Sequence, residues 1–484
     1  MGKGHPRILQ SRVGIVAVAL VAIALLLVNP VGFVGAGNDD FKYLTAARCW
    51  IDTGEMCLAS NHWETRWPIF APLAATLALV GEGRTAVSLS ALPYWIAAIS
   101  MTGWVAHLLF SRGAGLWAGA IFASIPVVTW FALRPNADLP ELTFQLAAIG
   151  SAITASRRGA KGWAVIAGVA TGLAIATRET SLLFLIISLP AWWLAAPGAR
   201  RLIGWAILGL ALAVGAEWAA YMAATDDPWA RYELAVGHGG IPSAYLKEGV
   251  DISRSPILNP EFIAGWIRPM GIEVWWPIDA WLNLFADPLI GMWLIAGLIA
   301  AAWRVREGRP EEKGALLAML LTGGILAGGL VYALAVDPRP RMFMLPAAFC
   351  AIALGRAIDV LWTKKRQPLA TVVPVALILL GALVLSRQSH TRPAEQAART
   401  WIAEHGDAIE IDRQTGEMLS MVSEAQGLAI APAGRPLRMT FRLEPCAEAL
   451  ADELAENAVS LVGEQAIPGG ASLCLLRYEE SRAD

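Results

Sequence analysis

The chain has 484 residues, of which 56% are hydrophobic and only 16% are charged, and its mean hydropathy is +0.51. A soluble core of this size needs less apolar material, so an ordinary soluble protein is excluded and a polytopic membrane protein is predicted. The formal net charge of −2 gives no indication of a nucleic-acid partner.

Eleven apolar runs have about the 20 residues that a membrane-spanning helix requires. They lie at about 13–34, 86–110, 114–133, 139–156, 162–178, 180–197, 202–223, 286–303, 314–336, 342–362 and 369–386. The predicted fold class is therefore mainly α, a transmembrane bundle of about 11 spans that occupies residues 1–386.

Basic residues occur before the first run and then in every second segment between runs, which fixes the expected orientation. After the N-terminal basic residues, these are Arg112, Arg157–Arg158–Lys161, Arg200–Arg201, Arg304–Lys313 and Lys364–Arg366. Loops rich in Lys and Arg face the cytoplasm. The sequence thus predicts a multi-pass protein of the inner (plasma) membrane, with its N-terminus in the cytoplasm and its C-terminus in the periplasm or outside the cell.

The first run has an alternative interpretation as a signal peptide, because basic residues precede it and Gly35, Ala36 and Gly37 follow it. We favour a retained helix. Its apolar stretch is longer than a usual signal core, and cleavage would detach Asp39 and Asp40 from the anchor that positions them.

Three segments expected outside the membrane are too long to be simple turns: about 35–85, about 224–285 and 387–484. In the first, the pattern predicts two amphipathic helices along the bilayer, at Asp40–Gly54 and Pro68–Val80. The second is rich in Pro and in Trp, a residue typical of the membrane interface.

Residues 387–484 change to a soluble composition and are predicted to form a small external α/β domain. Helices are expected at 393–404 and 446–456, and strands at 437–443, 459–462 and 472–478.

Four of the five cysteines fall in these external segments. Disulfides form in oxidising compartments, so Cys49 with Cys57 and Cys446 with Cys474 are natural pairs. The alternative is that all four are free, buried thiols.

Three acidic residues stand next to apolar runs at the expected external face: Asp39, Asp40 and Asp138. A charge beside the hydrocarbon layer is costly and is by default a functional-site hypothesis. The structural alternative is that Asp39 and Asp40 lie in the first turn of a helix, where the dipole favours acids, and that Asp138 caps the helix after it.

Three arginines with permanent positive charge are expected at the same external face: Arg66, Arg178 and Arg341. A carboxylate can take a proton from a nucleophile, and an arginine fork binds phosphate through two parallel hydrogen bonds. The alternatives are that Arg66 pairs with Glu64 or a lipid headgroup and that Arg178–Glu179 is a local ion pair.

Other chemistries have little support in the sequence. The six histidines are scattered without zinc-ligand spacing, and His238 is expected in a loop with a minor chance of substrate contact. Neither a phosphate-binding loop nor a dinucleotide fingerprint is present. No cofactor and no metal-ligand set are predicted, and a divalent cation stays open.

The order of the motifs resembles the GT-C membrane glycosyltransferases, in particular the protein O-mannosyltransferase and aminoarabinose transferase branch. The resemblance covers about the first 200 residues: Asp39-Asp40-x-x-Tyr43, then Arg66-Trp67-Pro68-Ile69, then Asp138, then Arg178–Glu179. Two departures from the family pattern are Asp40 in place of a Glu and Trp67 in place of a Pro, which put the geometry of the acceptor groove in doubt.

The resemblance implies a hexosyl- or pentosyltransferase that moves a sugar from a polyprenyl-phosphate donor to a hydroxyl of a lipid, glycan or protein acceptor. By position, Asp39 would be the general base, Asp138 and Asp40 further acids of the site, and Arg66 and Arg178 phosphate contacts. Arg341 is added as a phosphate contact because it is expected at the same external membrane boundary. Tyr43, Glu179 and His238 are proposed as further substrate contacts. The alternatives are a transporter, although no internal repeat is seen, and a lipid-glycan flippase without catalysis.

Overall fold

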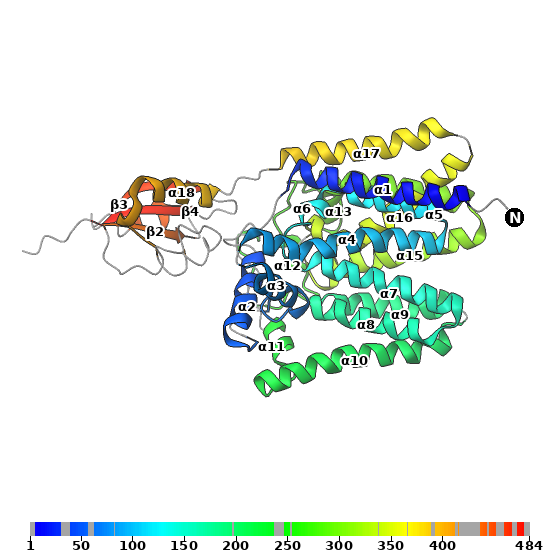
Figure 1. Ribbon diagram of the computed structural model, residues 1–484, viewed down its shortest axis with the longest axis horizontal. Helices are drawn as coiled ribbons and strands as arrows, with labels where there is room; N and C mark the ends of the chain where they lie inside the picture. The colour runs from blue at the N-terminus through cyan, green and yellow to red at the C-terminus, as the bar shows by residue number, and fades with distance from the viewer. Residues whose placement is uncertain are drawn as a thin grey trace, which may run out of the picture. The chain divides into compact units, whose positions relative to one another are not determined.

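The protein was analysed as a computed structural model, which describes residues 5–30, 39–56, 62–81, 83–195, 198–236, 246–251, 254–336, 338–364, 366–388, 393–411, 415, 436–442, 445–451, 459–466 and 472–478. The chain forms two compact units (Figure 1). The first contains Met1–Gly32, Tyr43–Leu79 and Val87–Gln388, and the second contains Phe33–Lys42, Val80–Ala86 and Ser389–Asp484.

Long apolar helices make up most of the first unit (Figure 1). They are α1 (His5–Val28), α4 (Arg84–Leu109), α5 (Arg112–Ser124), α6 (Pro126–Trp130), α7 (Asp138–Arg158), α8 (Lys161–Thr177), α9 (Ser181–Ala195), α10 (Arg200–Thr225), α14 (Gly291–Glu307), α15 (Pro310–Gly328), α16 (Met344–Thr363) and α17 (Gln367–Arg387). Each of the eleven predicted apolar runs overlaps at least one of these helices.

By length and composition, five helical segments within the described residues could each cross a membrane. These are α4, α10, α15 with its π-helical extension η2 (Gly329–Ala333), α16 with the preceding 3-10 turn η3 (Pro340–Phe343), and α17. A sixth is possible if α13 (Trp276–Ala286) and α14, which are bent by 99°, form one span. The structure thus supports several spans, while the total of eleven stays a prediction.

Two predicted runs are interrupted by proline. The run at 114–133 is divided between α5 and α6 at Ile125, because Pro126 lacks a backbone N–H and starts a new helix. The run expected at 286–303 contains Pro288 and becomes helical only at Gly291. Apolar composition alone does not reveal such breaks.

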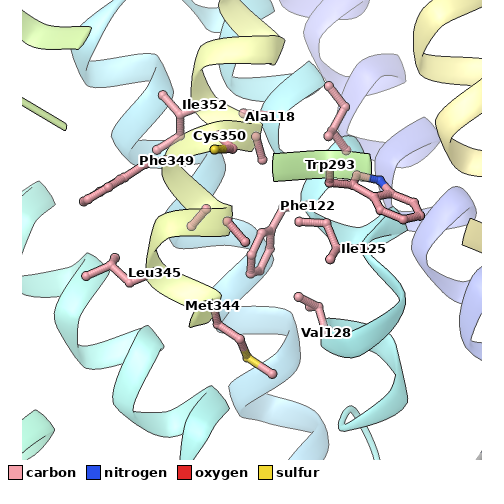
Figure 2. Packing of buried hydrophobic residues seen from close by; sticks show 14 of the residues in the cluster. Ala118, Phe122, Ile125, Val128, Trp293, Met344, Leu345, Phe349, Cys350 and Ile352 are labelled. Atoms are coloured by element: carbon pink, nitrogen blue, oxygen red, sulfur yellow. The ribbon is translucent and has the colours of Figure 1, made fainter. Parts of the chain in front are cut away.

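Helix α16 lies at the centre of the first unit, and 83% of its most apolar window is buried. Figure 2 shows Met344, Phe349 and Ile352 of this helix packed with Phe122 of α5 and Trp293 of α14. A Cβ atom at Gly355 would lie 2.6 Å from the backbone N of Ala118, so glycine is required where α16 and α5 approach closely.

Large apolar side chains on the outer helices are exposed, including Ile299 of α14, Leu194 of α9 and Leu379 of α17. In contrast, charged side chains such as Glu217 and Arg231 are buried in the interior. Exposed apolar side chains on the outside and buried charged side chains inside are the arrangement expected of a bundle surrounded by lipid.

Shorter helices follow the first span and fill the second long segment: α2 (Asp39–Thr53), α3 (Trp67–Val80), α11 (Ala230–Val236) and α12 (Pro260–Gly265). The first two match the predicted helices at 40–54 and 68–80 to within one residue. Their expected orientation along the bilayer stays a prediction.

The second unit contains a four-stranded sheet with the order β1-β2-β4-β3. The strands are β1 (Ile409–Ile411), β2 (Leu437–Arg442), β3 (Val459–Ala466) and β4 (Ser472–Tyr478), joined by helix α18 (Pro393–His405), the 3-10 turn η4 (Gly406–Ala408) and the short α21 (Cys446–Ala449). Only β1 pairs in parallel, with β2. Helices and strands occur together in this unit, as predicted. Strand β1 was not expected. The described residues contain only α21 of the helix that was predicted at 446–456.

The disulfide between Cys446 and Cys474 is confirmed, and it joins the start of α21 to the middle of β4. Cys49 is also disulfide-bonded. Its predicted partner, Cys57, lies outside the described residues. Cys350 is a free, buried thiol of α16.

Candidate active site

Asp138 is the first residue of α7, and its buried carboxylate lies between two guanidinium groups. Its Oδ1 accepts a hydrogen bond from Nη1 of Arg178 at 2.7 Å, and its Oδ2 is 4.0 Å from Nε of Arg341. The N-cap position of α7 is Ala137, and the Oδ1 of Asn136 accepts from the backbone N of Leu139 at 2.9 Å. Asp138 is therefore not the residue that caps the helix.

One turn further along α7, Glu141 forms a second acidic position that was not expected from the sequence. Its Oε1 accepts hydrogen bonds from Ser181 at 2.6 Å, from Thr180 at 3.2 Å and from Gln145 at 3.2 Å. Its Oε2 lies 3.9 Å from Nη1 of Arg178. An acid inside an apolar run, here 139–156, was the signal that could have identified it.

Arg66, immediately before α3, connects two other elements. Its Nη2 donates to Oε2 of Glu179 at 3.1 Å, and its Nη1 donates to the hydroxyl of Tyr43 in α2 at 3.2 Å. Three of the predicted site residues, Tyr43, Arg66 and Glu179, thus contact one another, and their roles toward substrate stay predictions. The alternative that Arg66 pairs only with Glu64 or a lipid headgroup is wrong.

The ion-pair chain continues into the protein interior through Arg231 of α11, which is completely buried. Its guanidinium donates to Oε1 of Glu179 at 2.9 Å, to the carboxylate of Glu217 in α10, and to the backbone oxygen of Ile175 at 2.8 Å. Tyr43, Arg66, Glu179, Arg231 and Glu217 thus form one continuous row of alternating partners, which we call the Glu179 network.

Electrostatics hold the Glu179 network in its charged form. Burial by itself would raise the pKa of Glu179, but the positive charges of Arg66 and Arg231 outweigh it and place this pKa well below the usual range of a glutamate. Burial likewise opposes the charge of Arg231, and the carboxylates of Glu179 and Glu217 reverse this and raise its pKa above that of an ordinary arginine.

Arg178 and Glu179, in the connection between α8 and α9, link the two clusters. Arg178 binds Asp138 and Glu179 binds Arg66 and Arg231, so the pair is not a local ion pair. Two neighbouring residues of the backbone therefore fix the acidic start of α7 relative to the Glu179 network.

A cleft opens beside Asp138, and three predicted site residues line it: Asp138, Arg178 and Arg341. Glu141, Gln145 and Thr180 complete its polar side, and side chains of α15 and α16, including Leu326, Leu330 and Leu345, form an apolar wall. The cleft thus places positive and negative groups directly next to an apolar surface.

Two arginines share the ring of Phe131 near this cleft. The guanidinium carbon of Arg134 is 5.0 Å from the ring centroid and that of Arg341 is 6.0 Å from it. Such contacts orient a cation over an aromatic face. Arg134 was not assigned a role from the sequence.

Asp39 and Asp40 lie in the first turn of α2, and the side chain of Asp40 is buried. In a helix, residues three or four positions apart share a face, so α2 itself carries both acids on the side of Tyr43. The position agrees with the helix-dipole interpretation and does not distinguish it from the catalytic one. His238 lies outside the described residues.

No group of three or more His, Cys, Asp and Glu side chains that could hold a metal ion occurs in the part of the chain that the structure describes. The acids of the two clusters are instead neutralised by arginines. The chemistry that this arrangement supports is recognition of an anionic group by arginine and proton transfer by a carboxylate.

The fold is similar to that of solved membrane glycosyltransferases. ArnT from Cupriavidus metallidurans, bound to undecaprenyl phosphate, matches with a TM-score of 0.56 and 15% sequence identity over 96% of this chain and 97% of that chain. The archaeal oligosaccharyltransferase AglB from Archaeoglobus fulgidus, in complex with an inhibitory peptide and a dolichol-phosphate, matches with a TM-score of 0.54 and 13% identity over 97% and 74% of the two chains.

No family model and no curated protein sequence matches the chain. ArnT and the oligosaccharyltransferase are both GT-C glycosyltransferases, so the predicted resemblance to that superfamily is confirmed at the level of the fold.

Proposed function

We propose that the protein is a membrane glycosyltransferase that moves a sugar from a polyprenyl-phosphate donor to a hydroxyl group of a lipid, glycan or protein acceptor. The observation that carries the proposal is the Asp138 cleft, where arginines and carboxylates border an apolar wall within a GT-C fold. A donor with a phosphate head and a long apolar tail needs both kinds of surface. The two similar structures hold undecaprenyl phosphate and dolichol-phosphate.

In the proposed reaction, one bond forms and one bond breaks at the anomeric carbon. The acceptor oxygen forms a bond with the anomeric carbon of the sugar, while the bond between that carbon and the phosphate oxygen breaks. A carboxylate takes the acceptor's proton, and polyprenyl phosphate leaves with the bonding electron pair. We assign the base to Asp39, with Asp40 and Asp138 as supporting acids and Tyr43, Glu179 and His238 as further substrate contacts.

Three arginines are proposed to hold the donor phosphate: Arg66, Arg178 and Arg341. Their contacts suggest different contributions. Arg341 and Arg178 line the cleft, with side chains that are 28% and 15% exposed. The side chain of Arg66 is 7% exposed. Arg341 is therefore the arginine best placed to reach a phosphate first, supported by Arg178.

We further propose eleven spans, a cytoplasmic N-terminus and an external domain at 387–484, so that the reaction takes place on the external face of the inner membrane. The alternation of basic segments supports this orientation. Nucleotide sugars are not available on that face, which favours a lipid-linked donor.

Release of polyprenyl phosphate by the purified protein tests the proposal. The full chain in detergent or lipid nanodiscs would receive a synthetic polyprenyl-phosphate sugar with candidate acceptors. If Asp39 is the base, Asp39→Asn lowers turnover by about 10²–10⁴-fold with donor binding nearly unchanged, because an amide of the same shape cannot accept the proton. Asp40→Asn should have a milder effect.

Two outcomes would contradict parts of the proposal. Wild-type turnover in Asp39→Asn would move the base to another carboxylate, with Asp138 the next to test. Movement of the lipid-linked sugar across the membrane without any release of polyprenyl phosphate would replace the transferase by a flippase or transporter.

A further inference from the structure

A second, larger cavity lies in the half of helix α7 that is remote from Asp138. Its volume is about 700 Å³, it is open on one side, and it is bordered mainly by α7, α8, α9, α10 and α15, which lie side by side in Figure 1. Apolar side chains dominate its walls, among them Ile149, Ile153, Leu189 and Leu210. Cavities of about 300–1,000 Å³ are typical of ligand sites.

Polar side chains also line this cavity, among them hydroxyl groups of α7, α8, α9 and α15. Ser156 is already satisfied, because its hydroxyl accepts from Nε1 of Trp192 at 2.7 Å. Two charged residues also line the cavity: Arg157, in the last turn of α7, and Glu311, in the first turn of α15. Both are exposed, and neither side chain forms an ion pair or hydrogen bond with any residue that the structure describes.

The cavity lining therefore contains one positive and one negative side chain that do not form an ion pair with each other. A ligand with both charges and an apolar tail would match it. A purely anionic headgroup would meet the carboxylate of Glu311, and a purely cationic one would meet Arg157. A phosphate beside a primary ammonium group satisfies both, since the guanidinium binds phosphate and the ammonium donates hydrogen bonds to the carboxylate.

We infer that this cavity binds a zwitterionic phospholipid with a primary amine headgroup, placing an acyl chain in the cavity, its phosphate at Arg157 and its ammonium group at Glu311. The site is distinct from the Asp138 cleft, because 19 residues of α7 separate Asp138 from Arg157, which is about 28 Å along a helix. It does not depend on the function proposed above.

A glycine offers a selective way to fill the cavity. Gly314 of α15 lines it, and a Cβ atom added there meets nothing within 4 Å, so Gly314→Phe adds a large side chain to the cavity lining without a clash at Cβ. Gly324→Phe is the matched control, because Gly324 lies on the same helix, is equally open and does not line the cavity. Gly314→Leu is a smaller replacement for use if the Phe variant is unstable.

Native mass spectrometry of the full-length protein with added phosphatidylethanolamine measures the bound lipid directly. Wild-type protein and Gly324→Phe should each retain one phosphatidylethanolamine after weakly held lipids have been stripped, and Gly314→Phe and Gly314→Leu should lose it. Equal retention in the cavity-filling and control variants would overturn the inference. Loss of bound polyprenyl phosphate instead would assign the cavity to an isoprenoid chain and equally overturn it.

The headgroup assignment is tested with Arg157→Gln and Glu311→Gln. Each should weaken phosphatidylethanolamine binding by about two- to fivefold, as expected for partly exposed charge pairs, and Glu311→Gln should remove the preference over phosphatidylglycerol. Arg158→Gln is the control, because Arg158 is the exposed neighbour outside the cavity lining. Equal binding of the two lipids to wild-type protein, unchanged in Glu311→Gln, would overturn the assignment.

Discussion

Single residues of the candidate site take their roles from partners that are distant in sequence. Arg66 binds a tyrosine 23 positions before it and a glutamate 113 positions after it, through different nitrogens of one guanidinium group. Only a planar, forked side chain can make both bonds at once. Arg66 consequently fixes the position of α2 relative to Glu179, in addition to its proposed role at the donor phosphate.

Arg66→Lys should therefore be costly although it keeps the charge. The ammonium group cannot reach both Tyr43 and Glu179, and loss of a hydrogen bond to a charged group costs about 1.5–3 kcal/mol. We expect turnover to fall at least tenfold, measured as polyprenyl-phosphate release. Arg254→Lys is the control, since the ion pairs of Arg254 with Asp251 and Glu261 are exposed. Equal effects of the two variants would exclude a specific role of Arg66.

Glu179 provides a prediction on pH. Its pKa is lowered in the folded protein, so its ion pairs stabilise the fold above the pKa of the unfolded chain, about 4.3, and this stabilisation is lost as the pH falls toward the folded value. The difference in Tm between wild type and Glu179→Gln should stay constant from pH 8 to pH 5 and shrink below pH 4. A difference that disappears already between pH 7 and pH 6 would show that Glu179 titrates there.

At the scale of elements, the Glu179 network joins α2, the start of α3, the α8–α9 connection, α10 and α11. Arg231 is its centre, because it is completely buried and compensates Glu179 and Glu217 together. A buried charge that loses its partner is far more costly than the same charge in an intact pair. The network thus makes the positions of several helix ends depend on one guanidinium group.

Arg231→Met should destabilise the helical unit by about 3–5 kcal/mol, because it leaves the buried carboxylate of Glu217 without its cation and leaves Glu179 with Arg66 alone. Adding Glu217→Gln should recover part of this loss by removing the uncompensated charge. Thermal unfolding of the detergent-solubilised full chain measures both effects. A wild-type Tm for Arg231→Met would show that water replaces the guanidinium at no cost.

At the scale of the whole molecule, the basic segments and the helices together support the proposed topology. The basic group Arg157–Arg158–Lys161 lies at the start of α8 and at the end of α7 that is opposite Asp138. The two ends of α7 are therefore expected at opposite faces of the membrane. The candidate site and the basic loops are thereby separated by the length of a span.

Reporter fusions test this topology. Fusions at Ser386 and at Asp484 should be active only with a reporter that works outside the cytoplasm, and a fusion after Arg158 only with a cytoplasmic reporter. Cytoplasmic activity at Ser386 or Asp484 would contradict the eleven-span arrangement and the external position of the site.

The sequence by itself determined the helices and the general nature of the site. Apolar runs of about 20 residues mark spans because a helix satisfies its backbone hydrogen bonds without help from neighbours, and the acids and arginines beside those runs were visible as costly charges. The pairing of Cys446 with Cys474 followed from their shared compartment and proximity within one small domain.

The tertiary structure alone determined which charged side chains form ion pairs with each other. The partners of Arg66, Arg178 and Arg231 come from segments up to 113 residues apart, and no local pattern encodes a contact that depends on helix packing. Glu217 carried a signal, as an acid inside the apolar run 202–223, but Arg231 lies outside any run and carried none. Ion pairs between distant helices become specific only when packing excludes water and limits the partners that each charge can reach.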